Sequence, residues 1–203
     1  MAMKDERKII LNADQLRKGP TSLKLRGMKK VKRNEIYIVL DSVLDTYNIG
    51  SIFRLADAVA AKKVYLCGGT ETPPNHRIKK ASINTTEIVE WEYCESAVEA
   101  IAKLTSDVGI PNEVKKMQLH LGGGKPLQVV AVEQSTKSVP YDQFDYRLPI
   151  CLIVGNESDG VSKEVLKACD AVVELPMFGI NKSLNVMVSL GIVLYKVIEK
   201  NNA

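Results

Sequence analysis

Short apolar runs recur along the chain, with helix-like segments between them. Six runs of strand length are nearly continuous in hydrophobic residues, which is typical of strands buried on both faces of a sheet. They lie at 36–40, 63–67, 87–91, 128–132, 150–154 and 171–175. Helix-like patterns fill 49–60, 96–105, 162–168 and 183–200. This alternation predicts one α/β domain with a mostly parallel sheet.

The last helix-like segment differs from an ordinary surface helix because its apolar residues occupy nearly every side. A helix of this kind is buried inside a domain or against another subunit. We expect Ser183 to cap its start and Gly191 to allow the close approach of a neighbouring element. Ser189, Gly191 and Lys196 interrupt the apolar run, which argues against a membrane span.

The composition is typical of a soluble globular protein whose cysteines are reduced. The chain has 203 residues, of which 45% are hydrophobic, and its first apolar patch, at 9–11, is too short for a signal peptide. Its 4 cysteines show no paired CxxC spacing. We therefore expect free thiols, a cytoplasmic location and no metal site.

Charge divides the chain into two parts. Residues 1–34 hold 11 Lys and Arg against 3 Asp and Glu, whereas the remaining 169 residues hold 17 against 21. We interpret 1–34 as a basic N-terminal extension, with a short helix capped near Asn12, and 35–203 as the folded domain. A basic arm on a mildly acidic body favours a polyanionic partner. The alternative is a solvated tail without a partner.

Polar loops follow three of the predicted strands, at the sheet edge where α/β proteins bind ligands. After the first strand, Asn48 stands where a helix begins, and Arg54 follows six residues later. The plain interpretation is a helix capped by Asn48 that carries a surface arginine. In the functional interpretation, both side chains point toward one ligand, and the guanidinium of Arg54 would bind a phosphate group of that ligand.

The other two loops occupy 155–160 and 175–185. In the first, two glycines bracket four polar residues, and either a turn capped by Asp159 or Ser162 or a ligand site explains that pattern. It matches neither the P-loop nor the GxGxxG fingerprint. The carboxylate of Glu157 would suit a cationic or hydroxyl-rich ligand. Three such loops together predict a composite pocket.

As a set, these segments resemble the SpoU-type (TrmH-like) RNA 2′-O-methyltransferases of the SPOUT superfamily. The resemblance rests on N-x-G-x-x-x-R at 48–54, G-N-E-x-x-G at 155–160 and P-M-x-G-x-x-x-S-L-N-V at 176–186, in that order. The strand that runs into 131–135 is similar to the family's fourth motif-bearing strand. The resemblance extends from about residue 35 to the C-terminus.

The resemblance implies a SPOUT-type parallel sheet whose C-terminal segment forms a deep trefoil knot around S-adenosylmethionine. It also implies a homodimer with the active site near the interface, so that the last helix packs on the sheet and on the partner. Six positions match the cofactor-binding residues of the family. They are Val132, Gly155, Leu175, Met177, Ser183 and Leu184.

The implied activity is methyl transfer to a ribose 2′-hydroxyl of tRNA or rRNA. The matching catalytic positions are Asn48, Arg54, Glu157, Ser183 and Asn185. The family proposal makes the arginine a general base, although a guanidinium is normally protonated. Arg54 therefore either loses its proton through strong desolvation or stays charged and stabilises the developing alkoxide. Ser183 and Asn185 would orient the ribose, and Glu157 would hold the arginine or its own loop.

RNA contacts are expected from the basic arm as well as from Arg54. The expected residues are Arg26, Lys29, Lys30, Lys32, Arg33 and Arg54. Two alternatives remain open: an RNA-binding or assembly protein of this fold without catalysis, and a methyltransferase acting on an RNA base. Every motif position that carries chemistry is filled, which argues against the first alternative. The N-x-G-x-x-x-R and S-L-N elements resemble the ribose-modifying branch of the superfamily, which argues against the second.

Overall fold

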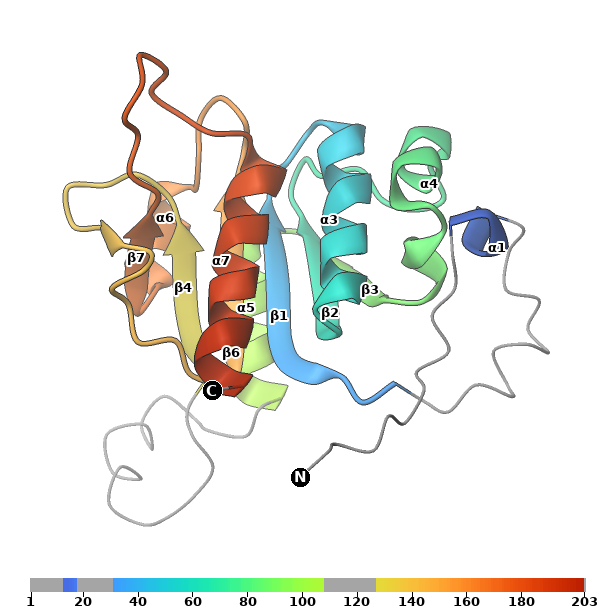
Figure 1. The fold of residues 1–203 in the computed structure, drawn as a ribbon, viewed down its shortest axis with the longest axis horizontal. Coiled ribbons are helices and arrows are strands. Elements are labelled where there is room, and N and C mark those ends of the chain that lie inside the picture. The colour runs from blue at the N-terminus through green and yellow to red at the C-terminus, as the bar shows by residue number, and fades with distance from the viewer. Residues whose placement is uncertain (1–12, 18–30, 108–126, 203) are drawn as a thin grey trace, which may run out of the picture.

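A single parallel sheet forms the centre of the protein. The computed structural model describes residues 13–17, 31–107 and 127–202. In this part of the chain seven strands pair in the order β3-β2-β1-β6-β4-β7-β5, and every pair is parallel (Figure 1). The strands are β1 Asn34–Asp41, β2 Ala61–Cys67, β3 Glu90–Cys94, β4 Gln128–Val132, β5 Val139–Pro140, β6 Ile150–Gly155 and β7 Ala171–Glu174.

Helices cover both faces of this sheet (Figure 1). They are α1 Ala13–Arg17, α3 Thr46–Ala58, α4 His76–Ser82, the 3-10 turn η1 Thr85–Glu87, α5 Ala97–Asp107, α6 Lys163–Ala168 and α7 Val186–Asn202. Helices α3, α4 and α7 lie on one face, and α5 and α6 on the other. The α/β class with a parallel sheet is confirmed, whereas the knot stays a prediction.

Successive side chains of the central strands point to opposite faces of the sheet, so each face has its own hydrophobic core. In β1, Ile38 and Leu40 pack against α3 and α7, while Tyr37 and Val39 face α5. Successive side chains of a strand point to opposite faces, so a strand covered on both sides must be apolar throughout. This requirement explains why the predicted strands in the sheet centre agree closely with the observed ones.

Three sequence expectations about element boundaries are wrong. The predicted strand at 87–91 begins later, at Glu90, because 85–87 form η1. Helix α3 begins at Thr46 and is capped by Asp45, whose Oδ1 accepts from the Tyr47 amide at 2.7 Å, so Asn48 is not the cap. Helix α7 begins at Val186, two residues later than expected from a Ser183 cap.

Helix α7 is buried on one side only within the single chain. Leu190, Val193, Leu194 and Val197 enter the core. A second row is solvent-exposed, with relative exposures of 37% for Val188, 37% for Ile192 and 55% for Tyr195. At Gly191 an added Cβ would lie 3.4 Å from Leu55, so the expected neighbour at this glycine is helix α3.

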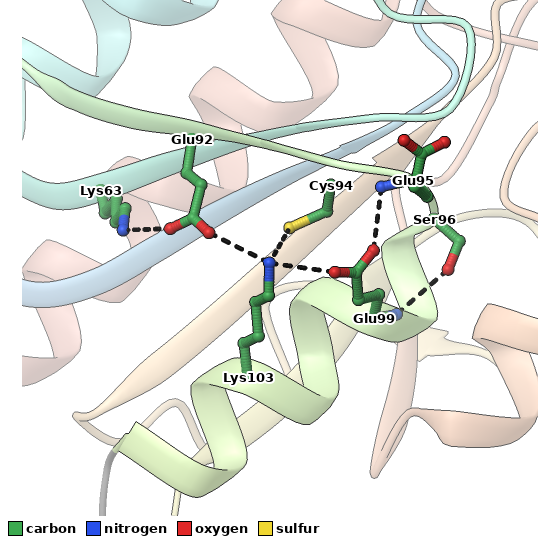
Figure 2. Close-up of polar contacts among 7 residues, drawn as sticks. All are labelled: Lys63, Glu92, Cys94, Glu95, Ser96, Glu99 and Lys103. Carbon is green, nitrogen blue, oxygen red and sulfur yellow. Dashed lines mark hydrogen bonds and ion pairs between the residues drawn. The ribbon is translucent and has the colours of Figure 1, made fainter.

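The edge strand β3 is attached to α5 by a network of charged side chains (Figure 2). Lys103 Nζ donates to Glu99 at 3.0 Å and to Glu92 at 3.1 Å, and Lys63 donates to the other Glu92 oxygen at 2.6 Å. The hydrogen bonds that Lys103 donates to Glu99 and Glu92 raise the pKa of Lys103, and those that Glu92 accepts from Lys63 and Lys103 lower the pKa of Glu92. These charged side chains lie between the strands and α5, on the face of the sheet that α5 covers (Figure 2).

A helix in the N-terminal extension contacts the domain. The short helix expected near Asn12 is present as α1, and the carbonyl of Leu16 accepts from Asn84 Nδ2 at 2.7 Å.

Candidate functional site

A cavity of about 310 Å³ lies at the carboxyl ends of β4, β6 and β7. The loop that follows β6 and the loop between β7 and α7 form its other walls. All six residues expected to bind a cofactor line it: Val132, Gly155, Leu175, Met177, Ser183 and Leu184. Polar groups that converge on a cavity, with a few apolar side chains among them, are typical of small-molecule sites.

The loop after β6 is a tight turn that depends on its two glycines. The Asn156 and Gly160 backbones exchange hydrogen bonds of 3.0 and 2.9 Å, and Asn156 Oδ1 accepts from the amides of Ser158 and Asp159. A Cβ on Gly155 would lie 2.1 Å from the Gly160 carbonyl carbon. Gly160 has a φ of 71°, and a Cβ there would lie 2.2 Å from Glu133 Oε2. Other side chains are therefore excluded at both positions.

Glu157, in this turn, joins the loop to the start of α3. Its two carboxylate oxygens accept from the Leu44 and Asp45 amides, each at 3.0 Å, and Oε1 also accepts from Asn48 Nδ2 at 2.9 Å. Partial burial raises the pKa of Glu157, but these hydrogen bonds outweigh that effect and the pKa is lowered. The Glu157 carboxylate therefore holds the loop after β1, and it makes no bond to Arg54 in the described chain.

Asn48 connects this carboxylate to the third motif. While its Nδ2 donates to Glu157, its Oδ1 accepts from Asn185 Nδ2 at 3.0 Å. Asn185 in turn caps α7, because its Oδ1 accepts from the amides of Met187 at 3.0 Å and Val188 at 3.3 Å. In both Asn48 and Asn185, the side-chain Nδ2 and Oδ1 atoms bond to different partners, so the orientation of each side-chain amide is fixed.

The structure brings four of the five expected catalytic residues together and leaves out the fifth. Glu157, Ser183 and Asn185 line the cavity, and Asn48 lies behind them. Arg54 is exposed on α3 and does not line the cavity. Within the described part of the chain, no hydrogen bond or ion pair joins its guanidinium to another residue.

Few of the residues expected to bind RNA can be placed. Arg26, Lys29 and Lys30 lie outside the described residues. Lys32 is exposed. The Arg33 guanidinium is partly buried and donates to the Ile88 carbonyl at 3.1 Å and to Asp57 at 3.4 Å, so it anchors the arm to the domain.

Glu133 and Gln134, which belong to the motif at 131–135 and follow β4 directly, line the cavity although neither was predicted as a site residue. Glu133 Oε2 accepts from the Val161 amide at 2.9 Å, and Gln134 Nε2 donates to the Lys182 carbonyl at 2.6 Å. Their position after a central strand is the signal that could have identified them, because polar residues at that edge face the ligand site.

The cavity is electrostatically one-sided. Its lining includes three carboxylate residues, Glu133, Glu157 and Glu174, whereas the lining contains no Lys, Arg or His. Such a lining suits a ligand that carries positive charge and hydroxyl groups. Across the described ranges, no group of three or more His, Cys, Asp or Glu is placed to hold a metal ion. None of the described helices is both long and apolar enough to span a membrane.

Comparison with known proteins gives consistent matches over this domain. The model of the SpoU rRNA Methylase family matches residues 35–195. A tRNA (guanosine(18)-2′-O)-methyltransferase of Aquifex aeolicus is 31% identical over 176 residues, which cover 85% of this chain and 73% of that protein. A 23S rRNA (guanosine-2′-O-)-methyltransferase of Ralstonia nicotianae, RlmB, is 26% identical over 194 residues, which cover 96% of this chain and 66% of that protein.

Solved structures agree with the sequence matches. The TrmH/SpoU tRNA-modifying enzyme of A. aeolicus superposes with a TM-score of 0.68 at 26% identity, covering 85% of this chain and 78% of that one. An AdoMet-bound rRNA methyltransferase of Sinorhizobium meliloti gives a TM-score of 0.64 at 27% identity, with coverages of 86% and 59%. With the family model matched over most of its length and its motifs gathered around one cavity, the chain belongs to the SpoU rRNA methylase family.

Proposed function

We propose that the protein is an S-adenosylmethionine-dependent methyltransferase that modifies a ribose 2′-hydroxyl of tRNA or rRNA. The observation that carries the proposal is the cavity itself, which unites the six expected cofactor residues with Glu157, Ser183 and Asn185. The relatives that bear the names of tRNA and rRNA 2′-O-methyltransferases support the choice of reaction.

The residues present fit the cofactor. Val132, Leu175 and Leu184 provide apolar surface for an adenine ring, while Gly155 and Met177 bring backbone groups close to the ligand. The carboxylates in the lining complement the sulfonium and ammonium charges. When bound, S-adenosylmethionine supplies an electrophilic methyl group, so the protein needs no nucleophile of its own.

The task of the protein is to place the ribose oxygen in line with that methyl group and to receive its proton. Asn185 and Ser183, on the cavity wall, would orient the ribose. Glu157 and Asn48 would keep Asn185 in place through the hydrogen bonds described above. Arg54, if charged, would stabilise the developing alkoxide and a neighbouring phosphate.

A homodimer would complete this site. The row of Val188, Ile192 and Tyr195 on α7 leaves an apolar face exposed, and the cavity residue Leu184 is 40% exposed beside it. Arg54 lies on the neighbouring helix α3, outside its own cavity. In a two-fold dimer that buries these faces, the arginine of one subunit would serve the cavity of the other.

The basic extension would bind RNA phosphates, with an affinity that falls steeply as salt rises. Arg33 anchors the end of this arm, and the exposed Lys32 lies next to it. The 4 free cysteines fit a cytoplasmic location for such an enzyme.

Calorimetry and nucleoside analysis test the proposal. The purified protein should bind S-adenosylmethionine, and incubation with labelled cofactor and bulk RNA should yield 2′-O-methylated nucleosides. A methylated base would instead indicate the base-modifying alternative. RNA binding without any methyl transfer would support an inactive assembly protein, and absence of cofactor binding would overturn the proposal.

A further inference from the structure

Glu133 and Gln134 contact both loops that enclose the cavity. Glu133 Oε2 accepts from the Val161 amide at 2.9 Å, at the end of the loop after β6. Its other oxygen accepts from the Gln134 amide at 2.7 Å, which fixes the carboxylate relative to its own backbone. Gln134 Nε2 donates to the Lys182 carbonyl at 2.6 Å, in the loop between β7 and α7. Both side chains start from the end of a central strand.

The loop between β7 and α7 depends on this contact. Residues 176–184 form neither helix nor strand, and Phe178 and Ile180 have relative exposures of 94% and 103%. An added Cβ on Gly179 would meet nothing within 4 Å. Within residues 176–184 of the described chain, the bond from Gln134 is the one hydrogen bond from the rest of the protein, and the loop is held again at its end, where Asn185 donates to Asn48. Met177, Ser183 and Leu184, which line the cavity, are all on this loop.

The loop after β6 depends on Glu133 in a different way. Gly160 has no room for a side chain because the Glu133 carboxylate occupies that space. The carboxylate therefore packs directly on the turn that presents Glu157, in addition to accepting from Val161. Each of its two oxygens accepts from one backbone amide, Oε2 from Val161 and Oε1 from Gln134.

We propose that Glu133 and Gln134 are positioning residues that clamp the two cavity loops to the end of β4, and that the Gln134–Lys182 bond sets how readily the cofactor enters and leaves. The inference rests on the proposed function for the identity of the ligand. Opening the loop between β7 and α7 requires this hydrogen bond to break, whereas the loop after β6 is held at several points. Cofactor exchange therefore proceeds through the β7–α7 side of the cavity.

The variant Gln134→Glu keeps the size of the side chain and removes its N–H groups. It also adds a negative charge to the cavity lining, which favours a cationic cofactor, so a raised Kd reports the lost hydrogen bond. A carboxylate cannot donate to the Lys182 carbonyl and is repelled by it. We expect the Kd for S-adenosylmethionine to rise about tenfold, mainly through faster dissociation, which stopped-flow measurements resolve. The matched control is Gln143→Glu, since Gln143 is exposed and its side chain has no hydrogen bond to the described residues.

Limited proteolysis tests the clamp without any cofactor. The Lys182 carbonyl that accepts from Gln134 belongs to the Lys182–Ser183 peptide bond, which trypsin can cut once the loop is free. Mass spectrometry should show faster cleavage of this bond in Gln134→Glu than in the wild type or in Gln143→Glu. If cleavage at Lys182 and the Kd are both unchanged, the clamp is overturned.

Glu133→Gln tests the second half of the clamp, with the exposed Glu95→Gln as its control. An amide offers one acceptor oxygen in place of two, so we expect a cofactor Kd raised about two- to tenfold while the Tm stays near that of Glu95→Gln. A lower Tm with an unchanged Kd would show a merely structural role and overturn the assignment. If the wild type does not bind the cofactor, the proposed function fails, and cleavage at Lys182 still decides whether the clamp exists.

Discussion

The side-chain amide of Asn48 donates to the carboxylate of Glu157 across a Nδ2–Oε1 distance of 2.9 Å, although 109 positions separate the two residues. With the bond from Asn185 to Asn48, this contact links one residue from each of the three sequence motifs. The motifs therefore occur together because each supplies one residue to a single series of hydrogen bonds. This series of hydrogen bonds ends at Asn185, which faces the cavity.

Substitution of Asn48 should impair catalysis more than cofactor binding. In Asn48→Asp the donor to Glu157 is replaced by a second carboxylate, and Asn48→Ala removes the link altogether, so Asn185 loses its fixed orientation. We expect methyl transfer to fall about 100-fold in either variant. Because Asn48 does not line the cavity, the Kd for S-adenosylmethionine should stay within about threefold of wild type. A large loss of affinity with near-normal turnover would place Asn48 in the cofactor site instead.

Glu157 should contribute stability that disappears in acid. Its pKa in the folded protein is lowered from the ordinary value of 4.5, so the folded state favours the carboxylate. The stabilisation is therefore complete above the ordinary pKa and is lost as the pH falls through the lowered value. Glu157→Gln should reduce the Tm at pH 7 by a few degrees (about 2–4 °C), and this difference should shrink below about pH 4. Calorimetry at both pH values checks this, and a difference that grows in acid would contradict it.

Gly50 should be intolerant of any side chain because α3 and α4 cross there. A Cβ would lie 2.5 Å from the Cβ of Ala81 and 2.7 Å from the Ile78 carbonyl oxygen. We expect Gly50→Ala to cost about 2 kcal/mol of unfolding free energy, measured by urea denaturation. Gly191→Ala is the matched control, since its Cβ would meet Leu55 at an ordinary 3.4 Å. That variant should be neutral or stabilised by up to about 1 kcal/mol, and equal losses in both would refute the crossing argument.

The sheet was predictable from sequence because its central strands are buried on both faces. The apolar run of β6, from Ile150 to Gly155, has no exposed position, and a run of that kind has no other simple explanation. Helix α4 was missed for the opposite reason. It buries only Ile78 and Ser82, so it has no apolar stripe to detect.

Residues that line the cavity were predictable from motif resemblance, whereas the contacts that position them were not. Nothing in the local sequence pairs Gln134 with Lys182, because 48 positions separate them and only the folded sheet edge brings them together. The helix caps were misassigned for a similar reason, because the local sequence does not determine them. Asp45 and Asn48 are both good capping residues, and their backbone conformations, which the sequence does not state, decide between them.

The exposed row on α7 should be a subunit interface. Val188, Ile192 and Tyr195 recur at helical spacing on one face, and an uncovered apolar row is costly in water. We expect the wild type to be a dimer and Ile192→Glu to shift it toward monomers, because the charge would be buried without a partner. Analytical ultracentrifugation measures the change. Lys200→Glu, an exposed position at the end of the same helix, should remain dimeric. A monomeric wild type would contradict the interface.

Mixing two inactive variants would show whether Arg54 acts across that interface. Arg54→Ala should lose about 100-fold or more in methyl transfer, with little change in Tm, because the side chain is exposed and has no partner among the described residues. Asn185→Ala should instead abolish methyl transfer in the cavity of the subunit that carries it. In a hybrid dimer, the cavity of the Arg54→Ala subunit keeps its own Asn185 and receives Arg54 from the other chain. After subunit exchange, half of the dimers are hybrids with one complete site, so about a quarter of wild-type activity should return. Arg147→Ala, which lies near the amino ends of the strands, should stay fully active on its own. If the mixture stays inactive although hybrids form, Arg54 serves its own subunit or none.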